Sequence, residues 1–294
     1  MNPADESYKL LYIMGTGRSG TTILEILLSA NDAVCSVGEL THIFQDGFEG
    51  NNTCACGTTF KLCEFWGKVQ QRLSYPPTRV LKYSKLFNKI DWHKGFLKTL
   101  FHSISPKNIG VYTQANKDLY DACSDISGKR VIVDSSKYPA RALMLNYIYG
   151  PSLKIICLTR SPEGILNAFL KTGVEQPSKS PFAVLIYYVY VLLASRIVAM
   201  ISKNVLCITF EELTGTPIQT LIKIERFTGV STEQARQQIQ GNTAFSPGHI
   251  ITGNRLRYNK AIFFHKKQPR LKLLPKTHKL FLLLMKASQK LLGF

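Results

Sequence analysis

The stretch that decides the fold is residues 10–28, LLYIMGTGRSGTTILEILL, in which an apolar run, a glycine-rich loop and a helical pattern follow one another. The run at 10–14 predicts a buried strand, and apolar residues at helical spacing from Ile23 onward predict a helix. Three glycines let backbone N–H groups approach an anion, the helix N-terminus adds partial positive charge, and Arg18 can add a charged fork. The stretch therefore predicts an anion-binding loop, the alternative being an ordinary strand–helix turn with a capping threonine.

Further short runs rich in Ile and Val occur at 33–37, 131–133, 153–158 and 205–210. Because they alternate with helical patterns, they predict an α/β fold with a P-loop-like parallel sheet flanked by helices. In such sheets ligands bind outside the carboxyl ends of the strands. We therefore expect the polar residues that follow the runs to lie close together, among them Glu39, Asp134, Lys137 and Arg160.

The 294 residues predict one domain of enzyme size, spanning 1–294. Residues 45 to about 125 have weak periodicity and predict a helical cap insertion. An irregular region at 240–270 precedes a basic C-terminal helix at 266–294. The hydrophobic content of 45% excludes a disordered or collagen-like chain.

The chain is strongly basic, with 37 Lys+Arg against 19 Asp+Glu and a net charge of +18. After Glu233 there are twelve Lys+Arg and no acidic residue. Such asymmetry predicts an anionic partner, whether phosphate, sulfate, nucleic acid or anionic lipid.

The expected location is the cytoplasm. The acidic start MNPADESYKL does not resemble a signal peptide, and the seven scattered cysteines do not resemble a disulfide framework. The apolar run at 182–201 contains Ser195 and Arg196, which favours a buried core helix over a membrane span.

The spacing within the loop narrows the kind of anion. Gly15 and Gly20 have the spacing of a nucleoside-triphosphate loop, but Thr21 stands where that loop has its lysine. The cation lies instead inside the loop, at Arg18. A single 5′-phosphate fits this arrangement better than a triphosphate.

The loop GTGRSGTT resembles the 5′-phosphosulfate loop of sulfotransferases that use 3′-phosphoadenosine 5′-phosphosulfate (PAPS), in their bacterial and tyrosylprotein-like branch. The resemblance implies that the 5′ side of the cofactor is bound by Gly17, Arg18, Ser19, Gly20, Thr21 and Thr22. The segment CLTRSPEGILNAFLKTG is similar to the family's second signature, in which an Arg, here Arg160, binds the 3′-phosphate. The family's Ser eight residues later is Ala168 here, so its neighbour Asn167 is the expected donor.

Three more segments extend the resemblance. VGELTHIF places Glu39 where these branches carry a catalytic acid, and VIVDSSKYPAR implies an active-site lysine at Lys137. GHIITGNRLR resembles the loop that closes on the cofactor in bacterial members, and would bind it through His249, Gly253, Asn254 and Arg257. The resemblance implies transfer of a sulfuryl group from PAPS to an acceptor hydroxyl, on a carbohydrate, lipid or other small molecule.

The chemistry is consistent with these residue types. Glu39 could act as the base on the acceptor hydroxyl, and Arg18 and Lys137 could stabilise charge on the leaving adenosine bisphosphate. A sulfuryl group carries less charge than a phosphoryl group, so no metal is required. The ordinary alternatives are that Glu39 is a turn or cap residue and that Lys137 is a solvated lysine.

Three cysteines, Cys54, Cys56 and Cys63, lie within ten residues. They could bind zinc with His42 as a fourth ligand, but the usual spacing is Cys-x-x-Cys. A similar Cys-x-Cys-Gly segment occurs in bacterial members of the family near the acceptor pocket. We expect packed thiols or a local disulfide here and assign no metal ligand.

The C-terminal segment 275–294 predicts a basic amphipathic helix, with one arc formed by Lys276, Lys279, Lys286 and Lys290. Such a helix can lie on an anionic membrane surface, which would make a lipid-linked or glycolipid acceptor plausible. The favoured alternative is a terminal helix packed on its own domain with its lysines in water.

Two other functions stay open. One is a small-molecule kinase, because residues 131–134 resemble a Walker-B strand that would suit magnesium, although Thr21 replaces the loop lysine. The other is a basic nucleic-acid- or membrane-binding protein with a vestigial loop. No zinc-finger, RNA-recognition or helix-turn-helix signature is present, so we expect no nucleic-acid partner.

Overall fold

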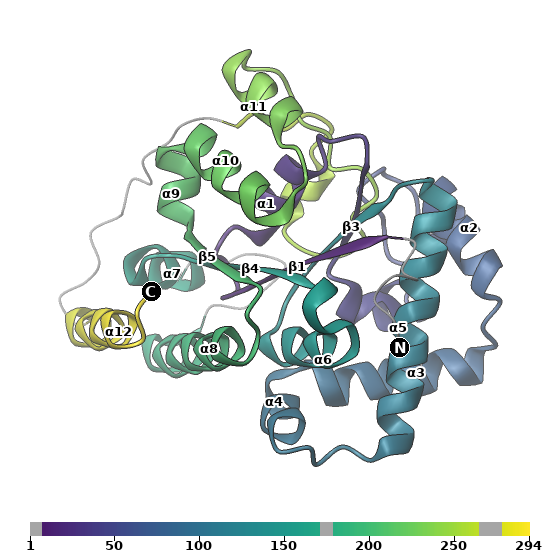
Figure 1. Cartoon of the computed structure of the whole chain (residues 1–294), viewed down its shortest axis with the longest axis horizontal. Coiled ribbons are helices and arrows are strands. Elements are labelled where there is room, and N and C mark those ends of the chain that lie inside the picture. The colour runs from purple at the N-terminus through teal and green to yellow at the C-terminus, as the bar shows by residue number, and fades with distance from the viewer. Residues whose placement is uncertain (1–7, 171–178, 265–277) are drawn as a thin grey trace.

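A parallel sheet forms the centre of the molecule (Figure 1). The computed structural model describes residues 8–170, 179–264 and 278–294. Within these residues the strands are β1 (Lys9–Gly15), β2 (Val34–Gly38), β3 (Val131–Lys137), β4 (Lys154–Thr159) and β5 (Val205–Thr209). They pair in the order β2-β3-β1-β4-β5, so the strand that enters the glycine loop lies in the middle. Each apolar run that predicted a strand overlaps one of these strands to within a residue or two, and the prediction of an α/β fold is confirmed.

Helices flank this sheet and fill the long segment between β2 and β3. That segment holds α2 (Glu64–Leu73), α3 (Pro77–Asp91), α4 (His93–Leu100) and α5 (Pro106–Ser127). The other α-helices are α1 (Thr21–Leu28), α6 (Pro139–Tyr149), α7 (Pro162–Leu170), α8 (Pro181–Ile201), α9 (Phe210–Gly215), α10 (Pro217–Thr228), α11 (Glu233–Gln240) and α12 (Lys279–Leu291). Short 3₁₀ or π turns lie at η2 (Leu40–His42), η3 (Ile43–Glu49), η4 (Phe60–Leu62), η5 (Gly150–Ser152) and η6 (Arg255–Tyr258).

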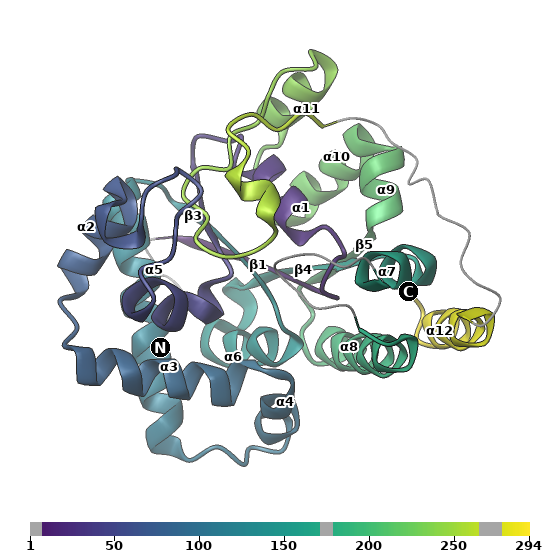
Figure 2. The ribbon, with the colours of Figure 1, turned by 180° about the vertical axis from the view of Figure 1, so that it is seen from behind.

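The sheet is buried on both faces. Leu10, Tyr12 and Met14 of β1 pack into a cluster with α3, α5 and α6, whereas Leu11 and Ile13 pack into a second cluster with α1 and α10. Both views show these two helical layers on opposite sides of the sheet (Figures 1 and 2). Because alternate strand residues point to opposite faces, burial of both faces explains why the strand runs are continuously apolar.

The apolar helix α8 is buried on one face only. It is the one described helix that is long and apolar enough to cross a membrane, and 39% of its most apolar window is buried. Tyr188 and Leu192 pack against α7 and α12, but Phe182, Ile186 and Met200 are 60%, 55% and 74% exposed. The prediction of a buried core helix therefore holds for one side of α8.

The C-terminal helix α12 packs beside α7 and α8 (Figure 1). Met285 is fully buried in the small cluster that these three helices share. The predicted helix at 266–294 is longer than α12, and Pro275 and Lys276 lie outside the described residues. Packing of a terminal helix on its own domain, the favoured alternative, agrees with this arrangement.

A buried arginine in α6 joins the helical segment to the sheet. Arg141 is 0% exposed, and all five of its N–H donors have acceptors within 3.0 Å. These acceptors are Asp134, Asp91, Tyr112, Asn116 and Tyr120. Because Asp134 lies in β3 and the other four lie in α3 and α5, the guanidinium fixes the position of both helices over the carboxyl end of the sheet.

Replacing this arginine by a neutral side chain of similar length should destabilise the fold strongly. Arg141→Met leaves two buried carboxylates without their cation, and we expect a loss of about 3–5 kcal/mol in the free energy of unfolding, measured by urea denaturation. Arg72→Met is the matched control, because the Arg72–Asp125 pair is half exposed and contributes about 0–1 kcal/mol. Equal losses in the two variants would contradict the importance of the buried network.

Candidate active site

The glycine loop between β1 and α1 is shaped for a close approach of backbone to ligand. A Cβ on Gly15 would lie 2.1 Å from the carbonyl oxygen of Leu158 in β4. One on Gly20, whose φ is +98°, would lie 2.5 Å from the ring of Phe210. Only glycine fits these positions, and Arg18 between them adopts a left-handed φ of 70°. The loop is thus held in one conformation by its neighbours.

Several buried polar atoms around this loop have no hydrogen-bond partner among the described residues. They are Thr16 Oγ1, Arg18 Nε, Ser19 Oγ, Arg160 Nε and Arg257 Nε. Buried donors in proteins are nearly always paired. Their presence beside a glycine loop and a helix N-terminus fits a site that takes its remaining acceptors from an oxyanion.

Arg160 follows β4 and lies against the glycine loop, as expected from its place after a strand. Its Nη1 donates to the carbonyl oxygen of Arg18 at 2.9 Å, and its guanidinium lies 4.4 Å from the ring centroid of Phe210. These contacts fix the guanidinium next to the loop. Asn167, the other residue expected at the 3′-phosphate, donates its amide to the carbonyl oxygen of Glu163 at 3.0 Å, within α7. Its role toward a ligand stays a prediction.

The loop that precedes and includes η6 lies across the glycine loop. The backbone N–H of Asn254 faces Thr22 Oγ1 at 3.4 Å, and a Cβ on Gly253 would lie 3.2 Å from the same oxygen. Arg257 is anchored by a bond from its Nη1 to the carbonyl oxygen of Gly253 and by stacking on Tyr258. Two of the four residues predicted in this loop, Gly253 and Asn254, thus contact the first turn of α1, which begins at Thr21, and Arg257 is bonded to Gly253.

Glu39 and Lys137 form an ion pair at the ends of β2 and β3. Lys137 Nζ lies 2.6 Å from Glu39 Oε1, the carboxylate side chain is 7% exposed, and Lys137 has a left-handed φ of 64°. His42 Nε2 lies 3.8 Å from Glu39 Oε2, and burial lowers the pKa of His42, which keeps its ring neutral near pH 7. Thr252 Oγ1 donates to the Glu39 carbonyl oxygen at 3.0 Å. The two expected catalytic residues therefore lie together, as their positions after strands predicted.

A row of aromatic rings runs from Glu39 toward the glycine loop. The ring of Tyr138 lies 6.0 Å from that of His42 and 5.2 Å from that of His93. Tyr187 continues the row at 5.4 Å from His93 and accepts the Gly17 N–H at 2.6 Å. His42 and Tyr138 lie within two of the quoted motifs, but nothing in the sequence grouped them with His93 and Tyr187, because the four residues come from separate segments. They form an apolar surface beside the ion pair that could hold the carbon skeleton of an acceptor.

Glu25 is a buried residue of the site that the sequence analysis missed. Its carboxyl group accepts from Gly38 N at 2.7 Å, Ser36 Oγ at 2.6 Å and Ser135 Oγ at 2.5 Å. It thereby ties α1 to the ends of the two strands that carry Glu39 and Lys137. Burial raises its pKa to about 7. The sequence did contain a signal for this buried carboxyl group, namely an acidic residue inside the apolar helix pattern at 21–28.

Asp134, the candidate magnesium ligand of the kinase alternative, is occupied by other groups. It is 0% exposed and accepts from Arg141, Tyr120 and Ser136. A carboxylate paired in this way is unsuited to hold a catalytic metal. The kinase alternative thus loses its second motif as well as its loop lysine.

The three cysteines lie together, and the histidine beside them is His249 rather than His42. Cys63 Sγ lies 3.6 Å from Cys54 Sγ, 3.7 Å from Cys56 Sγ and 3.2 Å from His249 Nδ1. All seven cysteines are free, so of the two expected alternatives, packed thiols or a local disulfide, the structure has packed thiols. The suggestion that His42 is the fourth ligand was wrong, because its ring lies against Glu39. His249, expected at the cofactor, has its Nδ1 among the thiols.

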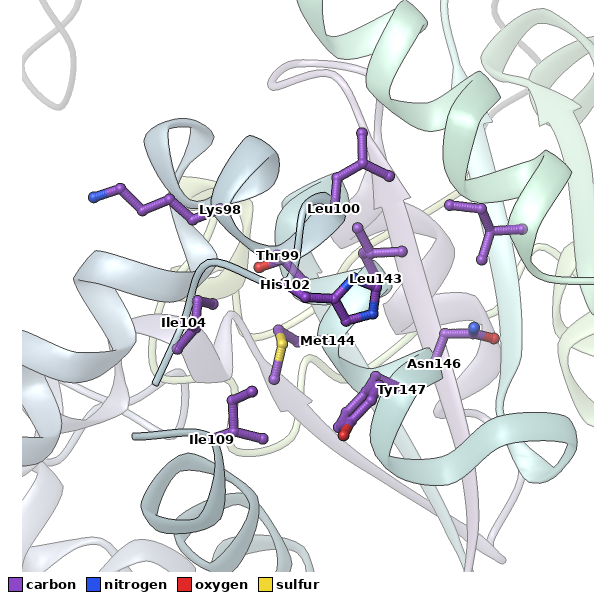
Figure 3. A pocket seen from close by; sticks show the side chains of 11 residues that line it. Lys98, Thr99, Leu100, His102, Ile104, Ile109, Leu143, Met144, Asn146 and Tyr147 are labelled. Atoms are coloured by element: carbon purple, nitrogen blue, oxygen red, sulfur yellow. The ribbon is translucent and has the colours of Figure 1, made fainter. Parts of the chain in front are cut away.

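An apolar cavity of about 140 Å³ lies apart from these residues, between α4, α6 and the end of α8 (Figure 3). His102, Met144 and Tyr147 are among its lining residues. None of the residues that line it belongs to the site described above.

Comparisons with known proteins agree with this geometry. The model of the sulfotransferase family matches residues 11–234. The sulfotransferase domain from the curacin biosynthetic pathway superposes with a TM-score of 0.58 at 16% identity, covering 98% of both chains. At that identity the likeness shows a shared fold.

Two further solved structures are more distant. The sulfotransferase domain of the Synechococcus PCC 7002 olefin synthase has a TM-score of 0.49 at 17% identity, covering 97% of both chains. Mouse sulfotransferase SULT7A1, complexed with PAP, has a TM-score of 0.44 at 16% identity and covers 98% of this chain and 85% of its own. The comparison with curated proteins gives no significant match.

The fold and the loop define a parallel α/β enzyme whose glycine loop lies at the carboxyl edge of its sheet. Because the family model spans well over half of the residues, the chain belongs to the sulfotransferase family. It is a transferase enzyme, and the resemblance seen in the sequence is confirmed at the level of the family.

The buried carboxyl group of Glu25 should make stability depend on pH. Its folded pKa of about 7 exceeds the ordinary value of 4.5, so the folded state binds the proton more tightly and loses stability as the pH rises from 4.5 to 7. Glu25→Gln removes this titration. In thermal melts across pH 4.5–8, the melting temperature of the variant relative to that of the wild-type protein should rise up to pH 7 and stay constant above it. A constant difference across this range would contradict the assignment.

Proposed function

We propose that the enzyme transfers a sulfuryl group from PAPS to an acceptor hydroxyl. The observation that carries the proposal is the set of buried donors without partners, around the glycine loop, Arg160 and Arg257, next to the Glu39–Lys137 pair. Donors for an anion and an acid–base pair at one sheet edge are the elements that transfer between an activated donor and a hydroxyl requires.

The residues present fit the nucleotide. Loop residues 16–22 would hold the 5′-phosphosulfate, Arg160 with Asn167 the 3′-phosphate, and Asn254 with Arg257 would cover the nucleotide. When bound, PAPS supplies an activated sulfuryl group, whose bond to the adenosine bisphosphate oxygen breaks as the acceptor oxygen bonds to sulfur.

Glu39 supplies the base. Its carboxylate takes the proton of the acceptor hydroxyl, and Lys137, 2.6 Å away, orients the carboxylate toward that proton. Arg18 and Lys137 would stabilise charge that develops on the leaving oxygen. The aromatic row of His42, Tyr138 and His93 would position the acceptor, for which a carbohydrate, a lipid or another small molecule is proposed.

Calorimetric titration tests the proposed donor. Adenosine 3′,5′-bisphosphate should bind without magnesium and better than ATP. Arg160→Ala should weaken it about 10- to 100-fold, because a hydrogen bond to a charged group contributes about 1.5–3 kcal/mol. Arg79→Ala, at an exposed arginine of α3, is the control.

In the same set of variants, Glu39→Gln should bind the bisphosphate normally but lower turnover about 100- to 10,000-fold. The exposed Glu49→Gln serves as its control. ATP binding that needs magnesium, with no bisphosphate binding, would favour the kinase alternative and exclude PAPS as the donor.

We also propose peripheral contact with an anionic membrane in the cytoplasm. On α12 the exposed leucines Leu280, Leu284 and Leu291 lie on one helix face, beside the exposed Lys279 and Lys290. The neighbouring helix α8 carries its own exposed apolar stripe. Apolar side chains flanked by lysines are the arrangement that binds acidic lipid surfaces.

Vesicle sedimentation tests this contact. The protein should sediment with phosphatidylserine-containing vesicles, less with phosphatidylcholine alone, and less again at high salt. Leu280→Glu combined with Leu284→Glu should abolish sedimentation, while Leu97→Glu, at a residue of α4 that is 56% exposed, should not. Equal sedimentation of all three proteins would argue against this surface.

A further inference from the structure

The cluster of three cysteines and one histidine joins two segments that are far apart in the sequence. Cys54, Cys56 and Cys63 lie between β2 and α2, and His249 lies in the loop that crosses the glycine loop. Their three Sγ atoms and the Nδ1 atom all lie within 4.8 Å of one another. Cys54 and Cys63 are 0% and 1% exposed.

The distances match tetrahedral zinc. With Zn–S bonds of about 2.3 Å and Zn–N bonds of about 2.0–2.1 Å, a tetrahedron places two sulfurs about 3.8 Å apart and a sulfur about 3.6 Å from the nitrogen. Cys63 Sγ lies 3.6 Å from Cys54 Sγ and 3.7 Å from Cys56 Sγ. His249 Nδ1 lies 3.9 Å from Cys54 Sγ and 3.2 Å from Cys63 Sγ. A disulfide would require about 2.05 Å between sulfurs, which no pair approaches.

We propose that these four residues bind one structural Zn²⁺ ion. Three thiolates and one imidazole fill a tetrahedral shell and leave no open position, as in structural rather than catalytic zinc sites. Each cysteine would bind the ion as a thiolate, so metal binding releases whatever protons the thiols still carry.

The surrounding backbone already holds the ligands in place. Cys54 N donates to Thr58 O at 2.8 Å and Gly57 N to Cys54 O at 2.9 Å, which forms a tight turn around Cys56. The ring of Phe65 stacks on His249 with centroids 5.5 Å apart. These contacts orient the four side chains toward a common centre.

The ion would fasten the loop that completes the active site. Trp66 Nε1 donates to His249 O at 2.5 Å, and Ala55 N donates to Ile250 O at 2.9 Å. Two residues further, Thr252 contacts Glu39, and Asn254 contacts the first turn of α1. The zinc site therefore positions the loop at which Asn254 and Arg257 would cover the nucleotide, and this consequence rests on the function proposed above.

Metal content tests the site directly. Protein freed of any affinity tag, and grown with zinc, should contain one zinc ion per chain by plasma mass spectrometry. Cys63→Ser and His249→Ala should lose most of the zinc, whereas the exposed Cys207→Ser should keep it. Replacing zinc by cobalt should give the visible absorption of a tetrahedral ion and a thiolate charge-transfer band.

A second measurement covers the case in which the variants do not fold. Titration of the wild-type thiols with a mercurial should release zinc to a coloured chelator, and should also weaken binding of adenosine 3′,5′-bisphosphate. Wild-type protein without stoichiometric zinc and without the cobalt spectrum would overturn the proposal, as would a disulfide between these cysteines in the intact mass. Zinc at full occupancy with no bisphosphate binding would leave the site standing and reject the proposed donor.

Discussion

A single buried guanidinium determines how the helical segment sits on the sheet. Arg141 uses all five of its donors, on side chains from β3, α3 and α5. A buried charge without a partner would destabilise the fold, so α6, β3, α3 and α5 are stable in this arrangement only when their charged and polar groups pair with one another. The network extends to the edge of the sheet that carries Glu39, because Thr41 donates to Asp91 at 2.6 Å and to Ser136 at 3.0 Å. Thr41 lies two residues after Glu39, which is therefore positioned by the same contacts.

Whereas all donors of Arg141 are paired, some buried polar atoms of the glycine loop are not. Three of its buried polar atoms, Thr16 Oγ1, Arg18 Nε and Ser19 Oγ, have no partner among the described residues, and the same holds for the Nε atoms of Arg160 and Arg257. An unpaired buried donor costs about 1–3 kcal/mol, so a fold keeps such groups only where another requirement favours them. Donors held ready for an anion need no rearrangement when it binds, which favours the charge that develops during transfer.

The loop from His249 to Arg257 connects three parts of the molecule. It contacts the cysteines at one end, Glu39 in the middle and the first turn of α1 beyond it. Few of its residues are in regular structure, so side-chain contacts and the backbone bonds to Trp66 and Ala55 determine its path. A proposed metal ion at one end and a proposed nucleotide at the other would both reduce its freedom, and would thereby couple the cysteine cluster, Glu39 and the glycine loop.

Local order in the sequence was enough to predict the strands, the glycine loop and the positions of Glu39, Lys137 and Arg160. Strand periodicity and glycine spacing are local, and parallel strands bring their carboxyl ends to one edge. Only the tertiary structure decided the side-chain pairings between residues that are far apart in the sequence. Glu25 is buried and accepts hydrogen bonds from residues of β2 and β3, and Asp134 is paired with Arg141. The histidine beside the cysteines is His249, 186 residues from Cys63, rather than the nearby His42. Burial and pairing across such separations follow from packing, which no local pattern records.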